Sequence, residues 1–191
     1  MSSSPPQSLV DIARRTESHL SAFLAVEEAR WSGFDSDLTS PVAEISRLVA
    51  SGGKRLRPAF SHWGFVGAGG DPNSQVSLDT GAALELLHAF ALFHDDIMDG
   101  SLTRRGAAVT HEVFADQHRN TGGSGEARRY GEGIAILVGD LAFVYSDQLM
   151  GDAPLAAREI WHELRIELNI GQLLDLIGTS LNERRRYKTE R

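Results

Sequence analysis

The sequence contains no cysteine and almost no lysine, and both absences limit the chemistry available to the chain. Without cysteine, neither a disulfide nor a thiolate metal site can form. Lysine occurs only at Lys54 and Lys188, so every other basic residue is an arginine. In a chain that otherwise avoids lysine, these two indicate positions where a compact ammonium group is needed. Two chance lysines are the alternative.

The sequence also lacks a basic tract, a signal peptide and a long apolar run. Its formal net charge is −7, which argues against a nucleic-acid partner. The N-terminus has no basic segment followed by an apolar stretch, and no apolar run approaches the roughly 18 residues of a membrane span. With 191 residues, 41% of them hydrophobic, the chain can bury one core. We therefore expect a soluble cytoplasmic protein of a single domain.

Apolar residues recur at helical spacing along most of the chain, and no segment alternates at strand spacing for long enough to predict a strand. We expect residues 1–8 to be disordered because they are rich in serine and proline. The pattern predicts helices over residues 9–30, 41–50, 58–66, 81–99, 130–150 and 154–181, with a turn at 31–40 and a loop at 67–77. Gly139-Asp140 interrupts the fifth pattern, which indicates two helices or one kinked helix.

The central feature is the stretch 81–106, an apolar helix that ends in a cluster of acids. Asp95, Asp96 and Asp99 precede Gly100, a glycine typical of the residue after a helix, so three carboxylates crowd the negative end of the helix dipole. A bound cation would turn this repulsion into attraction. Asp95 and Asp99 should lie about 6 Å apart along one face, a span that Mg²⁺ can bridge while it takes further oxygens from a diphosphate. An ordinary acidic helix end is the alternative.

Two basic groups accompany these acids. Lys54 and Arg57 lie in GGKRLRP, beside a helix that Pro58 is expected to open, and cations at a helix N-terminus form an anion site. Arg104 and Arg105 follow the acids within one loop and suit bidentate contacts to oxyanions. A solvated basic turn and an ordinary salt-bridge cluster are the competing interpretations. Taken together with the apolar helices, the three groups indicate a diphosphate with a hydrocarbon tail.

Five sequence blocks resemble, in the same order, those of the trans-isoprenyl diphosphate synthases, the polyprenyl synthetase family. The blocks are GGKRLRP, LLHAFALFHDDIMD with TRRG, ILVGDLAF, GQLLDL and YKT, and they cover about residues 44–189. The resemblance implies an all-α isoprenoid-synthase helical bundle around a central cavity, usually a homodimer. It also implies a Mg²⁺-dependent, 1′-4 head-to-tail condensation of isopentenyl diphosphate with an allylic diphosphate.

The resemblance assigns roles to individual residues. Asp95, Asp96 and Asp99 match the first aspartate-rich motif, in which Asp95 and Asp99 bind Mg²⁺. The catalytic residues it implies are Asp95, Asp96, Asp99, Arg104 and Lys188. The residues implied in substrate binding are Lys54, Arg57, His88 and Arg105 for isopentenyl diphosphate, Arg104 for the allylic diphosphate, and Gln172, Asp175, Lys188 and Thr189 facing the substrates.

The residues just before the acids bear on product length. Phe90 and Ala91, five and four residues before Asp95, resemble the pattern of archaeal-type and actinobacterial geranylgeranyl synthases, and Leu87 is expected to act with them. This favours a C20 product, with C15 or a longer chain as alternatives. If Phe90 forms the floor of the cavity, Phe90→Ala should lengthen the product.

The family also carries a second aspartate-rich motif downstream of its Lys-Thr element, and this chain stops at Arg191. We therefore expect residues 9–191 to be the N-terminal part of a single synthase domain with its C-terminal half absent. Such a chain is a fragment, or one piece of a split enzyme that a partner chain completes. A noncatalytic subunit would not need the intact acids and cations. A class I terpene cyclase would have no use for GGKRLRP.

Overall fold

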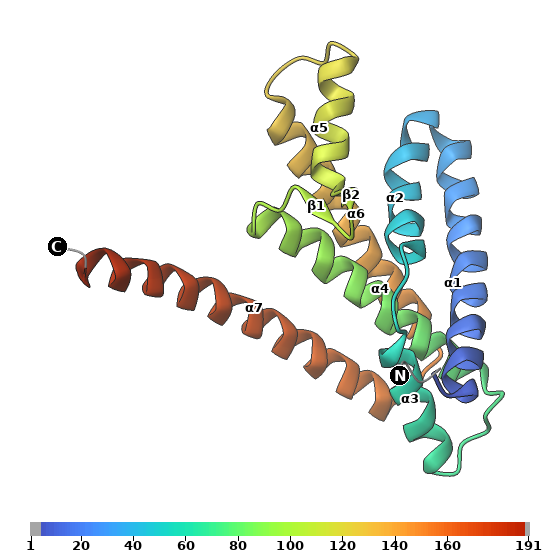
Figure 1. Cartoon of the computed structure of the whole chain (residues 1–191). Coiled ribbons are helices and arrows are strands. Elements are labelled where there is room, and N and C mark those ends of the chain that lie inside the picture. Colours follow the sequence, from blue (N-terminus) through green and yellow to red (C-terminus); the bar gives the residue numbers. More distant parts are fainter. Residues whose placement is uncertain (1–4, 190–191) are drawn as a thin grey trace. The chain divides into compact units, whose positions relative to one another are not determined.

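The computed structural model describes the backbone of residues 5–189 and the side chains of residues 5–179. The elements in chain order are α1 (Gln7–Phe34), the 3₁₀ helix η1 (Ser36–Leu38), α2 (Thr39–Ala50), α3 (Leu56–Gly67), α4 (Gln75–Met98), β1 (Thr103–Arg104), β2 (Ala107–Ala108), α5 (Thr110–Asn120), α6 (Ala127–Leu149) and α7 (Leu155–Thr189) (Figure 1). Within the described residues, the strands are confined to one short antiparallel ribbon. The all-α class is therefore confirmed.

The chain divides into two compact units, Met1–Gly151 and Asp152–Arg191. In the first unit α4 is the central helix: it packs against α1, α2, α3 and α6, while α5 packs on α6 and α1 lies beside α2 (Figure 1). The core of this unit includes Leu20, Leu24, Ile45, Leu86, Phe93 and Tyr145. The second unit contains α7, which leaves Ile166, Ile170, Leu173, Leu174 and Ile177 more than half exposed.

Both ends of α4 are set by local signals. The hydroxyl of Ser74 caps the N-terminus by accepting from the backbone N–H of Ser77. At the other end Gly100 has a φ of +61°, its N–H donates to Ile97, and the N–H of Ser101 donates to the carbonyl of Asp96 at 2.9 Å. This pair of bonds is the Schellman arrangement, so the prediction that Gly100 ends the helix is confirmed.

The predicted turn over residues 31–40 is wrong, because α1 continues to Phe34. Trp31 anchors the last turns: its indole nitrogen donates to Glu27 at 3.1 Å and to the hydroxyl of Tyr145 on α6 at 2.9 Å. The start of α1 at Gln7 also places two residues of the segment predicted to be disordered inside a helix. Pro58 lies in the first turn of α3, as expected, although that helix begins two residues earlier.

Of the two alternatives predicted at Gly139, two separate helices is wrong, because α6 is one continuous helix. A Cβ atom on Gly139 would lie 2.5 Å from Cδ2 of His94, so the glycine lets α6 cross α4 closely. The neighbouring Asp140 lies 3.3 Å from Nε2 of His94. Gly131 serves the same purpose against α5, since a Cβ there would overlap the carbonyl oxygen of His111. The last helix, predicted to end at residue 181, continues to Thr189.

Among the described helices, α4 alone is long and apolar enough to cross a membrane, judged by length and composition only. Half of its most apolar window is buried within the protein. This is the burial expected of a core helix, and it makes the length and composition of α4 weak evidence for a membrane span.

Candidate active site

The ribbon that follows α4 presents two arginines on a tight turn. Thr103 pairs with Ala108 and Arg104 with Ala107, which leaves Arg105 and Gly106 as the central residues of a two-residue hairpin. Their φ angles are +53° and +82°, the signs required by a type I′ turn. Residues 103–108 are called the arginine hairpin below.

Arg104 reaches back from this hairpin to the acids of α4. Its guanidinium donates to Asp96 from Nε at 3.0 Å and from Nη2 at 2.8 Å, and Nη2 lies 3.7 Å from Asp95. The hydrogen bond with Asp96 raises the pKa of Arg104, and the charges of all three acids add to it. Asp96 is only 5% exposed. Asp96 therefore faces Arg104, while Asp95 and Asp99 are left on the more accessible side of the helix end.

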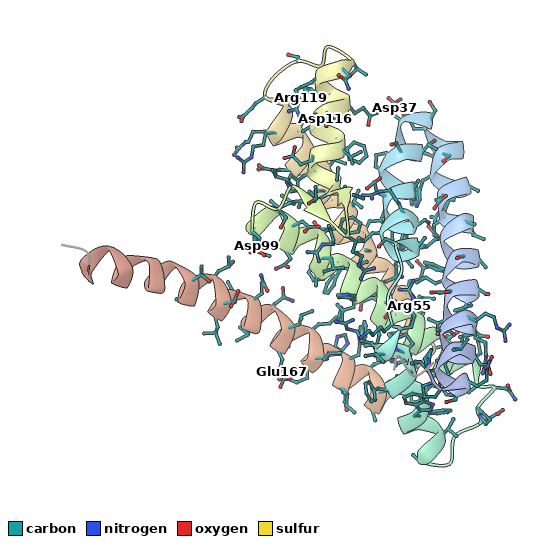
Figure 2. All side chains as sticks on the ribbon, in the orientation of Figure 1. Asp37, Arg55, Asp99, Asp116, Arg119 and Glu167 are labelled. Atoms are coloured by element: carbon teal, nitrogen blue, oxygen red, sulfur yellow. The ribbon has the colours of Figure 1, made fainter. Side chains whose placement is uncertain are left out.

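Asp95 and Asp99 lie one turn apart, because the backbone N–H of Asp99 donates to the carbonyl of Asp95 at 2.8 Å. Figure 2 shows Asp99 at the C-terminal end of α4. No cluster of three or more metal-ligating side chains occurs among the side chains that the structure describes. The two carboxylates still fit Mg²⁺, an ion that retains several waters and shares one or two carboxylates with phosphate oxygens.

The loop between α2 and α3, with the first turn of α3, carries a second set of cations. Lys54 and Arg57 are exposed, and Arg57 is the second residue of α3. Arg105 crosses from the hairpin to this loop, where it donates to the carbonyl oxygens of Ser51, at 3.3 Å, and of Gly52. The arginine hairpin and the GGKRLRP loop are therefore in direct contact.

Arg55 was not among the predicted site residues, and it has a different task from its neighbours. It is 7% exposed and donates to Glu17 on α1 at 3.0 Å, to Glu85 on α4, and to the carbonyl oxygen of Val49 on α2 at 2.6 Å (Figure 2). One guanidinium thus joins three helices beneath the loop. The sequence signal was weak: it consisted of an isolated Glu85 on an otherwise apolar stretch of α4.

His88 reports the electrostatic character of the site. It is half-buried on α4, two turns before Asp95, and its pKa is lowered to about 4. Burial is the main cause, and the positive charges of Arg57, Arg105, Arg104 and Arg55 follow in that order. His88 is therefore neutral at pH 7. Several guanidinium groups lie near it, and a bound anion would offset their positive charge.

The structure does not bring every predicted residue to this cluster. Lys54 borders a separate hollow of about 500 Å³ beside Leu9 and Val10 of α1. Gln172 and Asp175 lie one turn apart on α7, in the second unit. The side chains of Lys188 and Thr189 lie outside the described residues.

Of the residues expected to control product length, Phe90 lies between α4 and α6. The ring of Phe90 lies 4.6 Å from that of Phe143 and 4.7 Å from that of His94, measured between centroids. Leu87 is buried, and Ala91 is half-buried. Phe90 thus packs against α6 through Phe143, a residue that the sequence did not single out.

Comparison with known proteins gives one family. The model of the polyprenyl synthetase family matches residues 41–190, which include the acids, His88 and both groups of arginines.

Individual relatives agree with that match. The geranylgeranyl pyrophosphate synthase of Corynebacterium glutamicum, solved with isoprenyl diphosphate and magnesium, superposes with a TM-score of 0.78 at 35% identity, over 85% of this chain and 48% of the other. The probable farnesyl diphosphate synthase of Bradyrhizobium diazoefficiens is 33% identical over 87% of this chain and 46% of its own length. The short chain isoprenyl diphosphate synthase of Methanothermobacter thermautotrophicus is 33% identical over 63% and 31%. The chain spans less than half the length of each.

Proposed function

This chain belongs to the polyprenyl synthetase family, and from that premise we propose that its site binds isopentenyl diphosphate and an allylic diphosphate for a Mg²⁺-dependent, 1′-4 head-to-tail condensation. The observation that carries the proposal is geometric: Arg104 donates to Asp96 beside Asp95, and Arg105 donates to Gly52 in the GGKRLRP loop. His88 lies two turns before Asp95 on the same helix, near the positive charges of Arg57, Arg104 and Arg105. Seven residues of α-helix span about 10 Å, so cations and acids can act on two neighbouring diphosphates.

The proposal gives each group of residues a separate task. Asp95 and Asp99 would hold Mg²⁺, which when bound offsets the charge of a diphosphate and stabilises it as a leaving group. Arg104, already beside these acids, would bind the allylic diphosphate. Arg57 and Arg105 would bind isopentenyl diphosphate, with Lys54 as a further cation whose side chain must turn toward them. His88, being neutral, can donate one hydrogen bond to a phosphate oxygen without adding charge.

The reaction balances without any other reactant. The bond between C1 and oxygen of the allylic substrate breaks, and its electron pair leaves with the diphosphate. The double bond of isopentenyl diphosphate attacks C1, the new carbon–carbon bond forms, and a proton is lost to the released diphosphate. The cationic carbon requires a pocket that excludes water, which is the task proposed for the apolar residues Leu87, Phe90 and Ala91.

The finer assignments are proposals about the whole protein. We propose a C20 product on the basis of Phe90 and Ala91. Farnesyl or longer products are the alternatives, because the three relatives described above carry different product names. Gln172, Asp175, Lys188 and Thr189 complete the proposed substrate contacts. A cytoplasmic homodimer, or a chain completed by a C-terminal partner, is the proposed assembly, with residues 9–191 as part of one synthase domain.

Calorimetric binding of inorganic pyrophosphate with Mg²⁺ to this chain tests the site directly. Asp99→Asn and Arg105→Gln should each weaken binding about tenfold, which corresponds to about 1.4 kcal/mol. Asp116→Asn and Arg119→Gln are matched controls, because these two residues form an exposed ion pair on α5 and should leave affinity unchanged. Failure of the wild-type chain to bind pyrophosphate with Mg²⁺ would overturn the proposal.

A second measurement separates the proposed reaction from that of a terpene cyclase. Consumption of radiolabelled isopentenyl diphosphate in the presence of an allylic diphosphate is expected of the synthase, whereas a cyclase consumes only the allylic substrate. The assay is run with this chain alone and with a C-terminal partner added. Consumption that appears only with the partner supports a chain that needs completion, and turnover of the allylic diphosphate alone contradicts the condensation.

A further inference from the structure

The arginine hairpin needs outside support, because strands of two residues have little stability of their own. Arg104 ties it to Asp96 of α4, and Arg105 ties it to Ser51 and Gly52. Both of these connections use the guanidinium groups that the proposed function assigns to diphosphates. When a diphosphate takes them, the hairpin loses some or all of this support.

A third connection does not use these guanidiniums. Glu44 on α2 is 7% exposed and accepts from Nε of Arg47 at 2.8 Å, from Nη2 of Arg47 at 2.7 Å and from the hydroxyl of Thr110 at 2.8 Å. Thr110 is 4% exposed and is the first residue of α5, two residues after the hairpin ends at Ala108. Nη2 of Arg47 also lies 3.5 Å from the carbonyl oxygen of Ala108.

Apolar packing does not replace these polar contacts. A cavity of about 80 Å³ lies between α2 and the hairpin, lined by Leu48 and Ala107 among others, and Ser51 and Arg105 meet at its edge. Because contacts are missing across this space, the polar groups at its edge hold the two elements together. The carboxylate of Glu44 is buried with its charge compensated by Arg47, so removing a partner leaves a costly unsatisfied group.

We propose that Glu44 is a positioning residue for diphosphate binding. Through Thr110 and Arg47 it fixes the junction between β2 and α5, so that Arg104 and Arg105 keep their places when their present partners are exchanged for phosphate oxygens. This proposal rests on the proposed function, because it takes the two arginines as diphosphate ligands.

Substitutions at Thr110 test the connection without altering a charge. Thr110→Val removes the hydroxyl that donates to Glu44, whereas Thr110→Ser keeps it. Thr110→Val and Glu44→Gln should weaken the binding of pyrophosphate with Mg²⁺ about tenfold, the effect of losing one hydrogen bond to a charged group. Both should also speed hydrogen exchange of the amides of residues 101–109. Thr110→Ser should bind as the wild-type chain does.

Two variants elsewhere control for general loss of stability. Ser146→Ala removes a fully buried hydroxyl that bonds within α6, and Glu27→Gln neutralises a carboxylate of α1 that is 5% exposed. Both should lower the melting temperature and leave pyrophosphate affinity unchanged.

The outcomes distinguish the two proposals. A wild-type chain that binds no pyrophosphate overturns the proposed function, and this inference with it. A wild-type chain that binds, together with a Thr110→Val chain that binds equally tightly, overturns the inference alone. Equal loss of affinity in Thr110→Val and Ser146→Ala overturns it as well, because the effect is then global. If Glu44→Gln does not fold, the comparison of Thr110→Val with Thr110→Ser decides.

Discussion

Arg55 and Arg105 share a left-handed backbone, with φ of +48° and +53°, but the protein uses them in opposite ways. Arg55 is buried and is paired with two carboxylates, those of Glu17 and Glu85. Arg105 is exposed, and the oxygens of Ser51 and Gly52 that it contacts carry no net charge. The two guanidiniums flank the same point, since a Cβ on Gly53 would lie 3.8 Å from one and 3.9 Å from the other.

The difference shows how strained backbone is held at this site. Conformations of this kind cost about 1–3 kcal/mol each and persist where the surroundings enforce them. Burial and two ion pairs enforce the conformation at Arg55, so the charge of that arginine is used by the fold. Polar contacts at the surface hold Arg105, so its charge remains available to an anion. Within GGKRLRP, the central Arg55 therefore serves structure, whereas Lys54 and Arg57 are exposed and are the residues proposed to bind a ligand.

The largest expected effect tests the structural half of this comparison. Arg55→Met leaves the buried Glu85 without its cation, and breaking a buried pair in this way costs about 3–5 kcal/mol in free energy of unfolding. Urea denaturation measures it. Arg57→Met, two residues away and exposed, should change stability by about 0.5 kcal/mol or less.

A double variant sharpens the same test. Replacing both partners, as in Arg55→Met with Glu85→Leu, should recover part of the lost stability because no unpaired charge remains buried. If Arg55→Met costs no more than Arg57→Met, the distinction between structural and ligand-binding arginines is wrong.

The second effect concerns His88, whose pKa is lowered chiefly by burial and further by the positive charges of the surrounding arginines. His88 has a pKa of about 4 in the folded chain, against an ordinary value of 6.5. Between these two pH values, His88 is protonated in the unfolded chain and neutral in the folded chain. Stability is therefore fully present above pH 6.5 and falls as pH drops to about 4, by on the order of 1–2 kcal/mol after allowance for partial exposure. Denaturation of wild type and His88→Gln across this range measures it. Equal slopes in the two chains would show that the pKa of His88 is not lowered in the folded chain.

The sequence predicted those parts of the fold that depend on local signals. Gly100 ends α4 and Pro41 lies in the first turn of α2, because caps and fixed φ angles act within a few residues. The acids, His88 and the arginine pair were likewise predicted as site residues. Their presence in one region depends on the helix end and the tight hairpin, both of which leave a local pattern.

The errors came from contacts between distant residues. Glycine disfavours a helix, yet Gly139 lies within one because it gives space to His94, forty-five residues earlier in the chain. The turn predicted at Trp31 fails because Tyr145 accepts its indole hydrogen from another helix. Arg55 and Arg57 are the same residue type two positions apart. Only the placement of Glu85 in the fold, which a single sequence does not reveal, separates their roles.

The smallest expected effect on stability is at Arg105. Arg105→Asn converts the turn to Asn-Gly, the preferred pair for a type I′ turn, and removes the contacts with Ser51 and Gly52, whose exposure keeps their contribution to global stability below the gain in the turn. The free energy of unfolding should rise by about 0.5 kcal/mol, within the gains known for compatible turn substitutions. Pyrophosphate affinity should nevertheless fall about tenfold.

The same substitution at the other arginine completes the comparison. Arg55→Asn also places a residue that tolerates positive φ, yet it should destabilise the chain because the shorter amide cannot neutralise Glu85. Denaturation of both variants, with calorimetry on Arg105→Asn, measures the two effects. A loss of stability in both variants would mean that the contacts of Arg105 serve the fold as those of Arg55 do. A gain in stability with reduced affinity at Arg105 would instead show that this strained turn is maintained for its ligand.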